Sequence, residues 1–361
     1  MLLEKIQQNA SLLAEHPAYR CGEDSLTYSQ LWNAASLLAA QLQDGAGAVA
    51  LIGTKQPMMA VGMLGSLLAG RPYLPLSSDQ PKERLQRILS QANPGTVIDC
   101  REAKAEQWLK REPATQNFLI PGDPSRDAYW LFTSGSSGSP KGVRISLAAL
   151  ENFVRWFCAL PAIRFRKEPG VALNQAQFSF DLSVADLWPA WMMGETVFAL
   201  EPSQQADLDK LYRALGESGA TRMSCTPSFA RLCLCDKSFQ RELMPALQTV
   251  FFCGETLPAR TVRQLRQRFP GVTVLNAYGP TEATCAVCAV EVTGAGEPLP
   301  VGQLENTACQ LLILDRDGNE LPPGQSGEIA IAGQSVASGY LNAPAERFGS
   351  WQGQRLYRTG D

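Results

Sequence analysis

The stretch that decides the fold is YWLFTSGSSGSPKG, residues 129–142. It begins with an apolar run typical of a buried strand and continues into a loop of glycines, hydroxyl residues and one lysine. Glycines in such a loop adopt positive φ angles and let backbone N–H groups approach an anion. The hydroxyls add hydrogen-bond donors, and the lysine adds a compact positive charge. The stretch therefore predicts a strand that ends at a phosphate-binding loop.

Three better-known loops differ from this one at single positions. A Walker A loop places Ser or Thr after its lysine, whereas Gly142 follows Lys141 here. A nucleophile elbow needs glycine where Ser139 stands, and a Ser-x-x-Lys pair needs serine where Gly138 stands. The following residues, 143–146, read as a second short strand. We therefore expect a hairpin-like flap and not a turn from strand to helix.

The chain holds one histidine, His16, in a stretch that resembles an amphipathic surface helix. Serine and cysteine triads and most general-base schemes depend on histidine. We therefore expect a reaction that needs no side-chain base. A substrate carboxylate meets that condition, because it is already ionised at neutral pH.

Four further blocks follow the loop, and the five together resemble the adenylate-forming superfamily of acyl-CoA synthetases, luciferases and peptide-synthetase adenylation domains. The later blocks, in the family's order, are Phe180-Asp181-Leu182-Ser183, Asn276-Ala277-Tyr278-Gly279-Pro280-Thr281-Glu282, Gly327-Glu328-Ile329 with Tyr340-Leu341, and Tyr357-Arg358-Thr359-Gly360-Asp361. Within the superfamily the resemblance is closest to D-alanine–carrier protein ligases. That likeness is carried by residues 177–184 with Asp186, by residues 226–229 and by residues 252–255.

The resemblance implies ATP and Mg²⁺ as cofactors and gives each block a role. Lys141, Thr281 and Glu282 are the expected catalytic residues. Thr281 would contact the α-phosphate, and Glu282 would ligate the Mg²⁺. The expected nucleotide-binding residues in the loop are Thr133, Ser134, Gly135, Ser136, Ser137, Gly138 and Lys141.

Adenosine is expected to contact the block that ends at Glu282 and the last residue of the chain. Tyr278 would stack on adenine, Asn276 would read its exocyclic amine, and Asp361 would accept both ribose hydroxyls. The full set expected at this end of the nucleotide is Asn276, Ala277, Tyr278, Gly279, Thr281 and Asp361.

Asp181 favours an amino-acid substrate. It lies in an otherwise apolar run, where an unpaired carboxylate is costly, and a substrate ammonium would supply its partner. An ordinary N-cap aspartate is the open alternative. The resemblance adds Cys253, beside the substrate's α-carbon, together with Gly279 and Cys285, to the substrate pocket. Relatives often carry a small aliphatic residue where Cys285 stands, so the side-chain preference stays open.

The expected reaction is adenylation of a small amino acid, D-alanine above all, with release of pyrophosphate. The resemblance implies that a carrier protein then accepts the activated residue on its phosphopantetheine thiol, in cell-envelope polymer modification. A C-terminal lid domain follows the position of Asp361 in family members, and without it we expect slow adenylation and no completed transfer. Two alternatives stay open: an adenylation domain of peptide-synthetase type for glycine, L-alanine or proline, and a non-catalytic nucleotide- or carrier-binding protein.

Composition adds limits to this prediction. With 32 basic and 35 acidic residues, nothing favours nucleic acid or an anionic membrane as a partner. The longest apolar stretch, residues 58–70, is shorter than the roughly 20 residues that span a bilayer. The ten cysteines are scattered, and the pair Cys285 and Cys288 lacks a second pair at zinc spacing. We expect reduced thiols and a cytoplasmic protein.

The pattern predicts an α/β fold with two largely parallel sheets and flanking helices in a layered αβαβα arrangement, plus a small β-barrel subdomain. The expected subdomains are residues 1–120, residues 121–275 with the phosphate loop and substrate pocket, and residues 276–361 with the adenine and magnesium motif and the barrel. Expected strands include residues 48–52 and 249–252.

Overall fold

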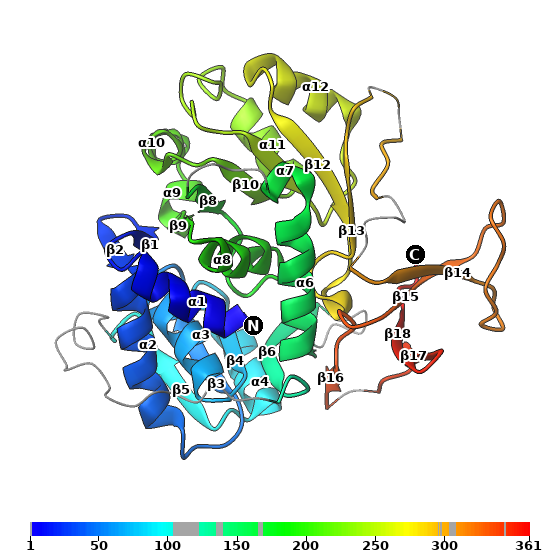
Figure 1. Ribbon diagram of the computed structural model, residues 1–361, viewed down its shortest axis with the longest axis horizontal. Helices are drawn as coiled ribbons and strands as arrows, with labels where there is room; N and C mark the ends of the chain where they lie inside the picture. The colour runs from blue at the N-terminus through cyan, green and yellow to red at the C-terminus, as the bar shows by residue number, and fades with distance from the viewer. Residues whose placement is uncertain are drawn as a thin grey trace.

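Two large β-sheets and a smaller third sheet organise the chain, and helices cover the large sheets (Figure 1). The structure is a computed structural model that describes residues 2–103, 123–134, 140–164, 169–294, 296, 298–302, 308–342 and 344–361. None of the helices among these residues combines the length and the apolar character of a bilayer span.

The first sheet has eight strands in the order β13-β12-β11-β10-β8-β9-β1-β2. The outermost pairs, β12–β13 and β1–β2, are antiparallel, and the other neighbours are parallel. The inner strands β8, β9, β10 and β11 are almost fully buried, because helices cover both faces of the sheet. The bounds are β1 (Pro17–Cys21), β2 (Asp24–Thr27), β8 (Val171–Asn174), β9 (Thr196–Ala199), β10 (Arg222–Cys225), β11 (Thr249–Phe252), β12 (Thr273–Tyr278) and β13 (Cys288–Glu291).

The second sheet has six strands in the order β16-β7-β6-β4-β3-β5. Strands β6 and β7 form the predicted antiparallel hairpin, in which Thr133 lies opposite Lys141. The phosphate loop thus connects two paired strands, and its residues 135–139 lie outside the described part of the chain. The bounds are β3 (Val49–Gly53), β4 (Tyr73–Ser77), β5 (Thr96–Asp99), β6 (Asp127–Ser134), β7 (Pro140–Ser146) and β16 (Gly339–Leu341).

Helices form three layers around the two sheets, which confirms the predicted αβαβα arrangement. The largest core cluster joins residues of both sheets to α1, α2, α3, α6 and α8, so these helices fill the space between the sheets. Helices α10, α11 and α12 pack on the other face of the first sheet, and α4 packs on the other face of the second. The bounds are α1 (Leu2–Leu12), α2 (Tyr28–Leu42), α3 (Pro57–Leu68), α4 (Lys82–Ala92), α6 (Leu147–Ala159), α7 (Pro161–Arg164), α8 (Leu182–Met193), α9 (Pro202–Gln205), α10 (Leu208–Ser218), α11 (Pro227–Leu234) and α12 (Ala259–Arg268).

Several helices start at hydroxyl caps that the sequence supplies. Thr27 and Gln30 form a capping box at α2, in which each side chain accepts the other residue's backbone N–H. Ser146 caps α6 by accepting from the backbone N–H of Ala149 at 3.1 Å. Thr226 caps α11 in the same way, so the strand–helix turns that surround the site are fixed locally.

The third sheet is antiparallel, in the order β14-β15-β18-β17. It lies to one side of the large sheets, next to β16 and β13 (Figure 1). Its four strands form an open ladder, so the predicted barrel is not confirmed. The turn after β14 is held by Asp315, whose carboxylate accepts from the backbone of Asp317 and Asn319. The bounds are β14 (Gln310–Leu314), β15 (Glu328–Ala332), β17 (Phe348–Trp351) and β18 (Gln354–Arg358).

Sheet membership does not follow the subdomain boundary predicted after residue 120. Strands β1 and β2 join the sheet built mainly from residues 171–291, whereas β6 and β7 join the sheet of residues 49–99. Pairing between strands far apart in sequence is set by tertiary packing, which local patterns do not report. The division into three subdomains stays a prediction.

The structure corrects the prediction for His16. It lies after α1, in the turn before β1, and not on a surface helix. Its ring is half-buried, stacks near Tyr28 at 6.3 Å between centroids, and has Nε2 3.3 Å from Oγ1 of Thr196. A structural role in packing α2 against β9 follows from these contacts.

Candidate active site

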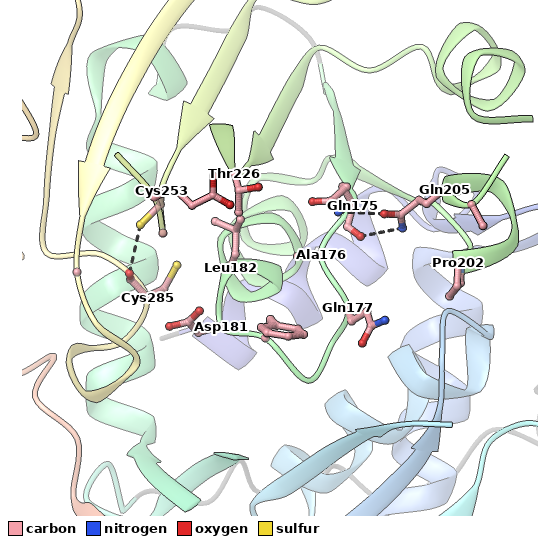
Figure 2. Close-up of a pocket in the computed structure, with 15 residues that line it drawn as sticks. Gln175, Ala176, Gln177, Asp181, Leu182, Pro202, Gln205, Thr226, Cys253 and Cys285 are labelled. Carbon is pink, nitrogen blue, oxygen red and sulfur yellow. Dashed lines mark hydrogen bonds between the residues drawn. The ribbon is translucent and has the colours of Figure 1, made fainter. Parts of the chain in front are cut away.

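A cavity of about 660 Å³ opens where β8, β10, β11 and β12 end (Figure 2). Ligands of α/β sheets bind at the carboxyl ends of the strands, because the loops that leave those ends converge there. One wall is the segment 174–181 between β8 and α8. The opposite wall holds Cys253, Gly279 and Cys285, three residues that the sequence predicts for the substrate pocket.

Asp181 points into this cavity (Figure 2). It occupies the N-cap position of α8, yet its side chain makes no capping hydrogen bond. Instead its Oδ2 accepts from the Oγ1 of Thr281 at 2.6 Å. The N-cap alternative therefore does not describe this carboxylate, and the contact joins two sequence blocks that are 100 residues apart.

The carboxyl of Asp181 titrates above its usual range. Burial raises the pKa of Asp181 to about 6, although the hydrogen bond from Thr281 opposes the shift and the charge of Glu282 adds to it. Burial disfavours the ionised form, and a nearby cation would favour it. The cavity thus offers a carboxylate that gains from a bound ammonium group.

Two thiols lie close together on the wall opposite the 174–181 segment. The Sγ of Cys253 lies 3.6 Å from the carbonyl oxygen of Cys285, and both side chains are almost fully buried in the protein (Figure 2). Cys285 and Thr284 have φ angles of 69° and 60°, a region that non-glycine residues seldom adopt. This turn directs the Cys285 side chain toward the cavity.

Gly279 cannot be replaced without moving the backbone. A β-carbon at this position would lie 2.5 Å from the Cα of Ala286. The close approach brings the end of β12 against the turn that carries Cys285. Glycine is therefore required where the end of β12 meets this turn beside the cavity.

A second cavity, of about 490 Å³, lies on the other side of Asp181. It shares Gln177, Phe180 and Asp181 with the first cavity, and it is also lined by Thr133 and Thr281. Asp181 and Thr281 thus lie at the junction between the first cavity and the end of β6. Ser134 is the last residue of β6, and the structure describes its backbone but not its side chain. The other predicted loop residues, Gly135, Ser136, Ser137 and Gly138, lie outside the described residues.

Lys141 and Glu282 meet around one tyrosine. The Nζ of Lys141 lies 5.4 Å from the centroid of the Tyr340 ring, and the Tyr340 hydroxyl donates to Oε1 of Glu282 at 2.7 Å. The Tyr340 hydroxyl is also 3.4 Å from that of Tyr357. Burial, followed by the hydrogen bonds to Tyr357 and Glu282, raises the pKa of Tyr340, which keeps its hydroxyl protonated as a donor. Four sequence blocks therefore meet at this point.

Glu282 is the carboxylate that could hold a metal ion here. It lies in the short 3-10 helix η1 (Thr281–Ala283), and its backbone carbonyl accepts from Ala337 N at 2.8 Å. In the described part of the chain no three or more His, Cys, Asp or Glu residues form a metal-binding group. Mg²⁺ fits such a site, because it commonly binds one or two carboxylates and takes its other ligands from phosphates and water.

The residues predicted for adenosine lie at the end of β12 and the end of the chain. Asn276 is buried, and its Nδ2 donates to the carbonyl oxygen of Pro300 at 2.7 Å. Ala277 follows it on β12, also buried. The Tyr278 hydroxyl donates to Oδ2 of Asp361, so this carboxylate and this ring are neighbours. Stacking of Tyr278 on adenine and ribose binding by Asp361 stay predictions.

Sequence reasoning missed parts of the site. Gln175 and Gln205 line the cavity as an amide pair, with Nε2 of Gln175 donating to Oε1 of Gln205 at 2.9 Å (Figure 2). Glu255 also lines the cavity and accepts from the Oγ of Ser228 at 2.6 Å. The hydroxyl of Tyr340 was part of a matching block, but its contact with Glu282 needs the pairing of β16 with β7. Local sequence carries no signal for that pairing.

Comparison with known proteins identifies the family. A sequence model of the AMP-binding enzymes matches residues 6–341. The chain belongs to the AMP-binding enzyme family. The family predicted from the five blocks is thereby confirmed. Ligases of this family use ATP and form AMP-linked intermediates.

Curated relatives within the family are ligases. The D-alanine–D-alanyl carrier protein ligase of Bacillus licheniformis is 38% identical over 386 residues, which cover 100% of this chain and 76% of that protein. The protein of the same name from Bacillus cereus is 36% identical over 389 residues, again covering 100% and 76%. The resemblance to this group of ligases therefore extends along the whole chain.

Solved structures share the fold. The N-terminal subdomain of Klebsiella oxytoca NpsA in complex with 3-hydroxyanthranilyl-AMSN matches with a TM-score of 0.81 at 23% identity, covering 99% of this chain and 95% of that one. The Vibrio cholerae adenylation domain AlmE in complex with glycyl-adenosine-5'-phosphate matches with a TM-score of 0.83 at 21% identity, covering 100% and 76%. These likenesses confirm the α/β fold.

Proposed function

We propose that this AMP-binding enzyme activates D-alanine as its acyl-adenylate and releases pyrophosphate. The observation that carries the proposal is Asp181, a carboxylate at the junction of two cavities, one beside buried thiols and the other beside the end of β6. The names of the relatives from two Bacillus species support D-alanine as the substrate.

The amino acid would lie in the larger cavity with its ammonium on Asp181. The charge pair would satisfy a carboxylate that burial otherwise penalises. Cys253, Gly279 and Cys285 would then surround the α-carbon and the side chain. With the ammonium held on Asp181, the two hands of alanine would direct the methyl group to different parts of the wall, and Cys253 and Cys285 would be its neighbours for the D form.

The reaction needs two substrates held in line and no side-chain base. An oxygen of the amino-acid carboxylate forms a bond to the α-phosphorus of ATP, and the bond from that phosphorus to the bridging oxygen breaks. The electron pair leaves with pyrophosphate, and no proton has to move. Thr281 would donate to the α-phosphate, and Lys141 with Thr133, Ser134 and the loop 135–138 would hold the β- and γ-phosphates.

Glu282 would hold Mg²⁺, with Tyr340 fixing the orientation of its carboxylate. When bound, Mg²⁺ neutralises phosphate charge as the pyrophosphate leaves. The adenosine would lie between Tyr278 and the end of β12, with Asn276 Oδ1 accepting from the exocyclic amine. Asp361 now accepts a hydrogen bond from the Tyr278 hydroxyl, and on nucleotide binding it would accept from the ribose hydroxyls instead.

The second half of the proposed reaction passes D-alanine to the phosphopantetheine thiol of a carrier protein. The names of the relatives support this partner. The three subdomains and the cytoplasmic location predicted from the sequence belong to the same proposal. Ten free thiols agree with a reducing compartment.

Amino-acid-dependent exchange of labelled pyrophosphate into ATP tests the proposed function. The panel is D-alanine, L-alanine, glycine and proline. Exchange supported by D-alanine well above the others is the expected result. If glycine, L-alanine or proline supported exchange best, D-alanine would not be the substrate, and the chain would be an adenylation domain of peptide-synthetase type. Binding of ATP without any exchange would favour the non-catalytic alternative.

Amino-acid recognition is expected to weaken as pH falls through 6. Because the pKa of Asp181 is raised to about 6, its carboxyl group takes up a proton below that pH and no longer attracts an ammonium. We expect the KM for the amino acid to rise by about tenfold per pH unit below 6, while the KM for ATP changes less. Initial rates of exchange at pH 5 to 7.5 measure both. A flat amino-acid KM over this range would contradict the role of Asp181.

Replacing Tyr340 by phenylalanine is expected to raise the Mg²⁺ requirement. The variant keeps the ring beside Lys141 but removes the hydroxyl that donates to Glu282. Groups that orient a metal ligand typically contribute about 10- to 100-fold to affinity or activity. Titration of exchange activity with Mg²⁺ should show a several-fold higher half-saturating concentration. An unchanged titration curve would contradict the role of Tyr340 in orienting the Glu282 carboxylate.

A further inference from the structure

Lys55 is a buried lysine that lies outside every sequence block. It sits in the turn between β3 and α3, and only 1% of its surface is exposed. Its ammonium donates to Oδ1 of Asn174 and, at 2.5 Å, to the carbonyl oxygen of Ala176. The centroid of the Phe178 ring lies 4.2 Å from Nζ. Because a buried charge is costly, such a complete set of contacts indicates a defined role.

The three contact partners belong to the wall of the amino-acid cavity. Gln175, Ala176 and Gln177 all line the cavity, and Asn174 and Phe178 flank them in the chain. Lys55 therefore binds one residue of this wall directly, through the carbonyl oxygen of Ala176, and also contacts the two flanking residues. A space of about 10 Å³ beside Lys55 is lined by Gln177, which also lines the cavity.

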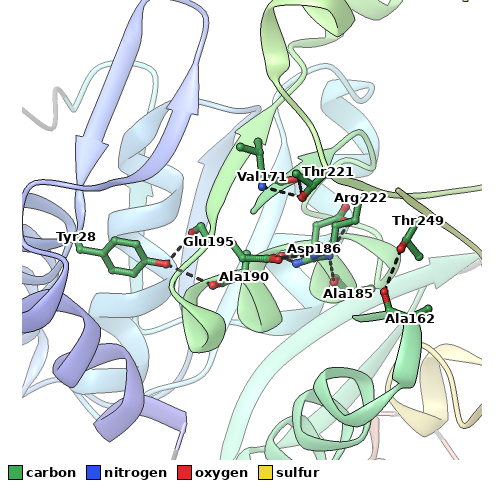
Figure 3. A network of polar contacts seen from close by, with 10 residues as sticks. All are labelled: Tyr28, Ala162, Val171, Ala185, Asp186, Ala190, Glu195, Thr221, Arg222 and Thr249. Atoms are coloured by element: carbon green, nitrogen blue, oxygen red, sulfur yellow. Dashed lines mark hydrogen bonds and ion pairs between the residues drawn. The ribbon is translucent and has the colours of Figure 1, made fainter. Parts of the chain in front are cut away.

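The wall is also tied to a buried charge network. Asn174 Nδ2 donates to Oδ2 of Asp186 at 3.2 Å, and Oδ1 of Asp186 lies 3.8 Å from Arg222 Nη1. Arg222 Nε donates to Oε2 of Glu195 at 2.8 Å (Figure 3). The four charged side chains of this set are each at most 2% exposed: the cations Lys55 and Arg222 and the anions Asp186 and Glu195. Loss of the Lys55 charge would leave this buried set with an excess of negative charge.

We propose that Lys55 is a positioning residue of the amino-acid site, whose ammonium fastens the β8–α8 segment to the second sheet and so sets the position of Asp181. Lys55 belongs to the turn after β3 in one sheet, and its partners lie at the end of β8 in the other and just after it. The same segment ends at Asp181. This inference rests on the proposed function, because it assigns Lys55 to an amino-acid site.

Amino-acid binding should depend on pH through the protonation of Lys55. Burial lowers the pKa of Lys55 to about 7, with Asp186 on α8 and Cys21 on β1 opposing the shift. The ammonium is therefore present below pH 7 and is lost as pH rises above it. A neutral amine donates weaker hydrogen bonds to Asn174 and Ala176. The KM for the amino acid is then expected to rise above pH 7, a range separate from the titration of Asp181.

The first test compares Lys55→Met with Arg71→Met. Arg71 is a matched control: it is a buried cation next to the same sheet that donates to the carbonyl oxygens of Gly47 and Ala46, away from the cavity. Lys55→Met should raise the KM for the amino acid about tenfold with little change in the KM for ATP. Arg71→Met should lower stability without this selective change. A folded Lys55→Met with an unchanged amino-acid KM, or with both KM values raised equally, would overturn the proposal.

The wild-type pH profile is a test that needs no variant. The amino-acid KM should rise several-fold from pH 7 to 8.5, and in Lys55→Met this rise should disappear. A flat wild-type profile would overturn the proposal even where Lys55→Met fails to fold.

Hydrogen–deuterium exchange separates this proposal from the proposed function. The peptide that spans residues 174–181 should take up deuterium faster in Lys55→Met than in Arg71→Met, with no substrate present. Equal uptake would overturn the positioning role. If no amino acid supports pyrophosphate exchange by the wild type, the proposed function fails, whereas faster uptake at 174–181 would still support the fastening of this segment by Lys55.

Discussion

Replacing Asp181 by asparagine is expected to lower kcat/KM for the amino acid by on the order of 10²-fold or more. Asparagine preserves the shape and can still accept from Thr281, so the change removes the charge alone. Removing one member of a buried charge pair costs on the order of 3–5 kcal/mol. Because Asp181 is only half-buried, the loss of binding free energy here should be smaller. Pyrophosphate exchange at saturating ATP measures the loss, and ATP binding by calorimetry should stay within about twofold.

Glu255 provides the contrast for this experiment. It is a second carboxylate on the same cavity, but it accepts from both the backbone N–H and the hydroxyl of Ser228 and is exposed. Glu255→Gln is expected to change kcat/KM much less than Asp181→Asn. If Glu255→Gln caused the larger loss, the ammonium would bind at Glu255 and not at Asp181.

Replacing Glu282 by glutamine is expected to lower kcat for exchange by on the order of 10²–10³-fold. The amide keeps a partner for Tyr340 but loses the negative charge that would ligate Mg²⁺. Loss of one group that stabilises charge in the transition state has an effect of this size. The measurement is the exchange rate across a Mg²⁺ titration with ATP and D-alanine held constant.

Glu291 supplies a matched control for Glu282. It is an exposed carboxylate at the end of β13, away from both cavities. Glu291→Gln should leave kcat and the Mg²⁺ titration unchanged. A Glu282→Gln enzyme with near-normal kcat at every Mg²⁺ concentration would contradict the metal role of this carboxylate.

Much of the fold, and the place of the block that ends at Glu282, could be predicted, because the signals are local. The apolar run before the loop and the short strand after it predicted the β6–β7 hairpin, and β11 has the bounds expected from residues 249–252. The block that ends at Glu282 lies on β12 and η1, beside the cavity. These features depend on residue order within short windows.

The remaining features depend on contacts between distant segments. Lys55 stands in a short polar turn and reads as a solvated lysine, yet packing of the two sheets buries it against Asn174. The Tyr340 hydroxyl reaches Glu282 only because β16 adds to β7. A small barrel was expected within residues 276–361, but whether strands close into a barrel depends on pairing between their edges. Pairing of this kind is fixed by global packing.

The most direct test of the central claim is exchange of pyrophosphate into ATP with D-alanine and L-alanine measured in parallel. We expect D-alanine to give a kcat/KM at least about tenfold higher than L-alanine, since a buried pocket that holds one hand places the methyl group of the other against its wall. Equal rates, or a preference for L-alanine, would contradict the assignment of D-alanine. The family and the fold would be unaffected by that result.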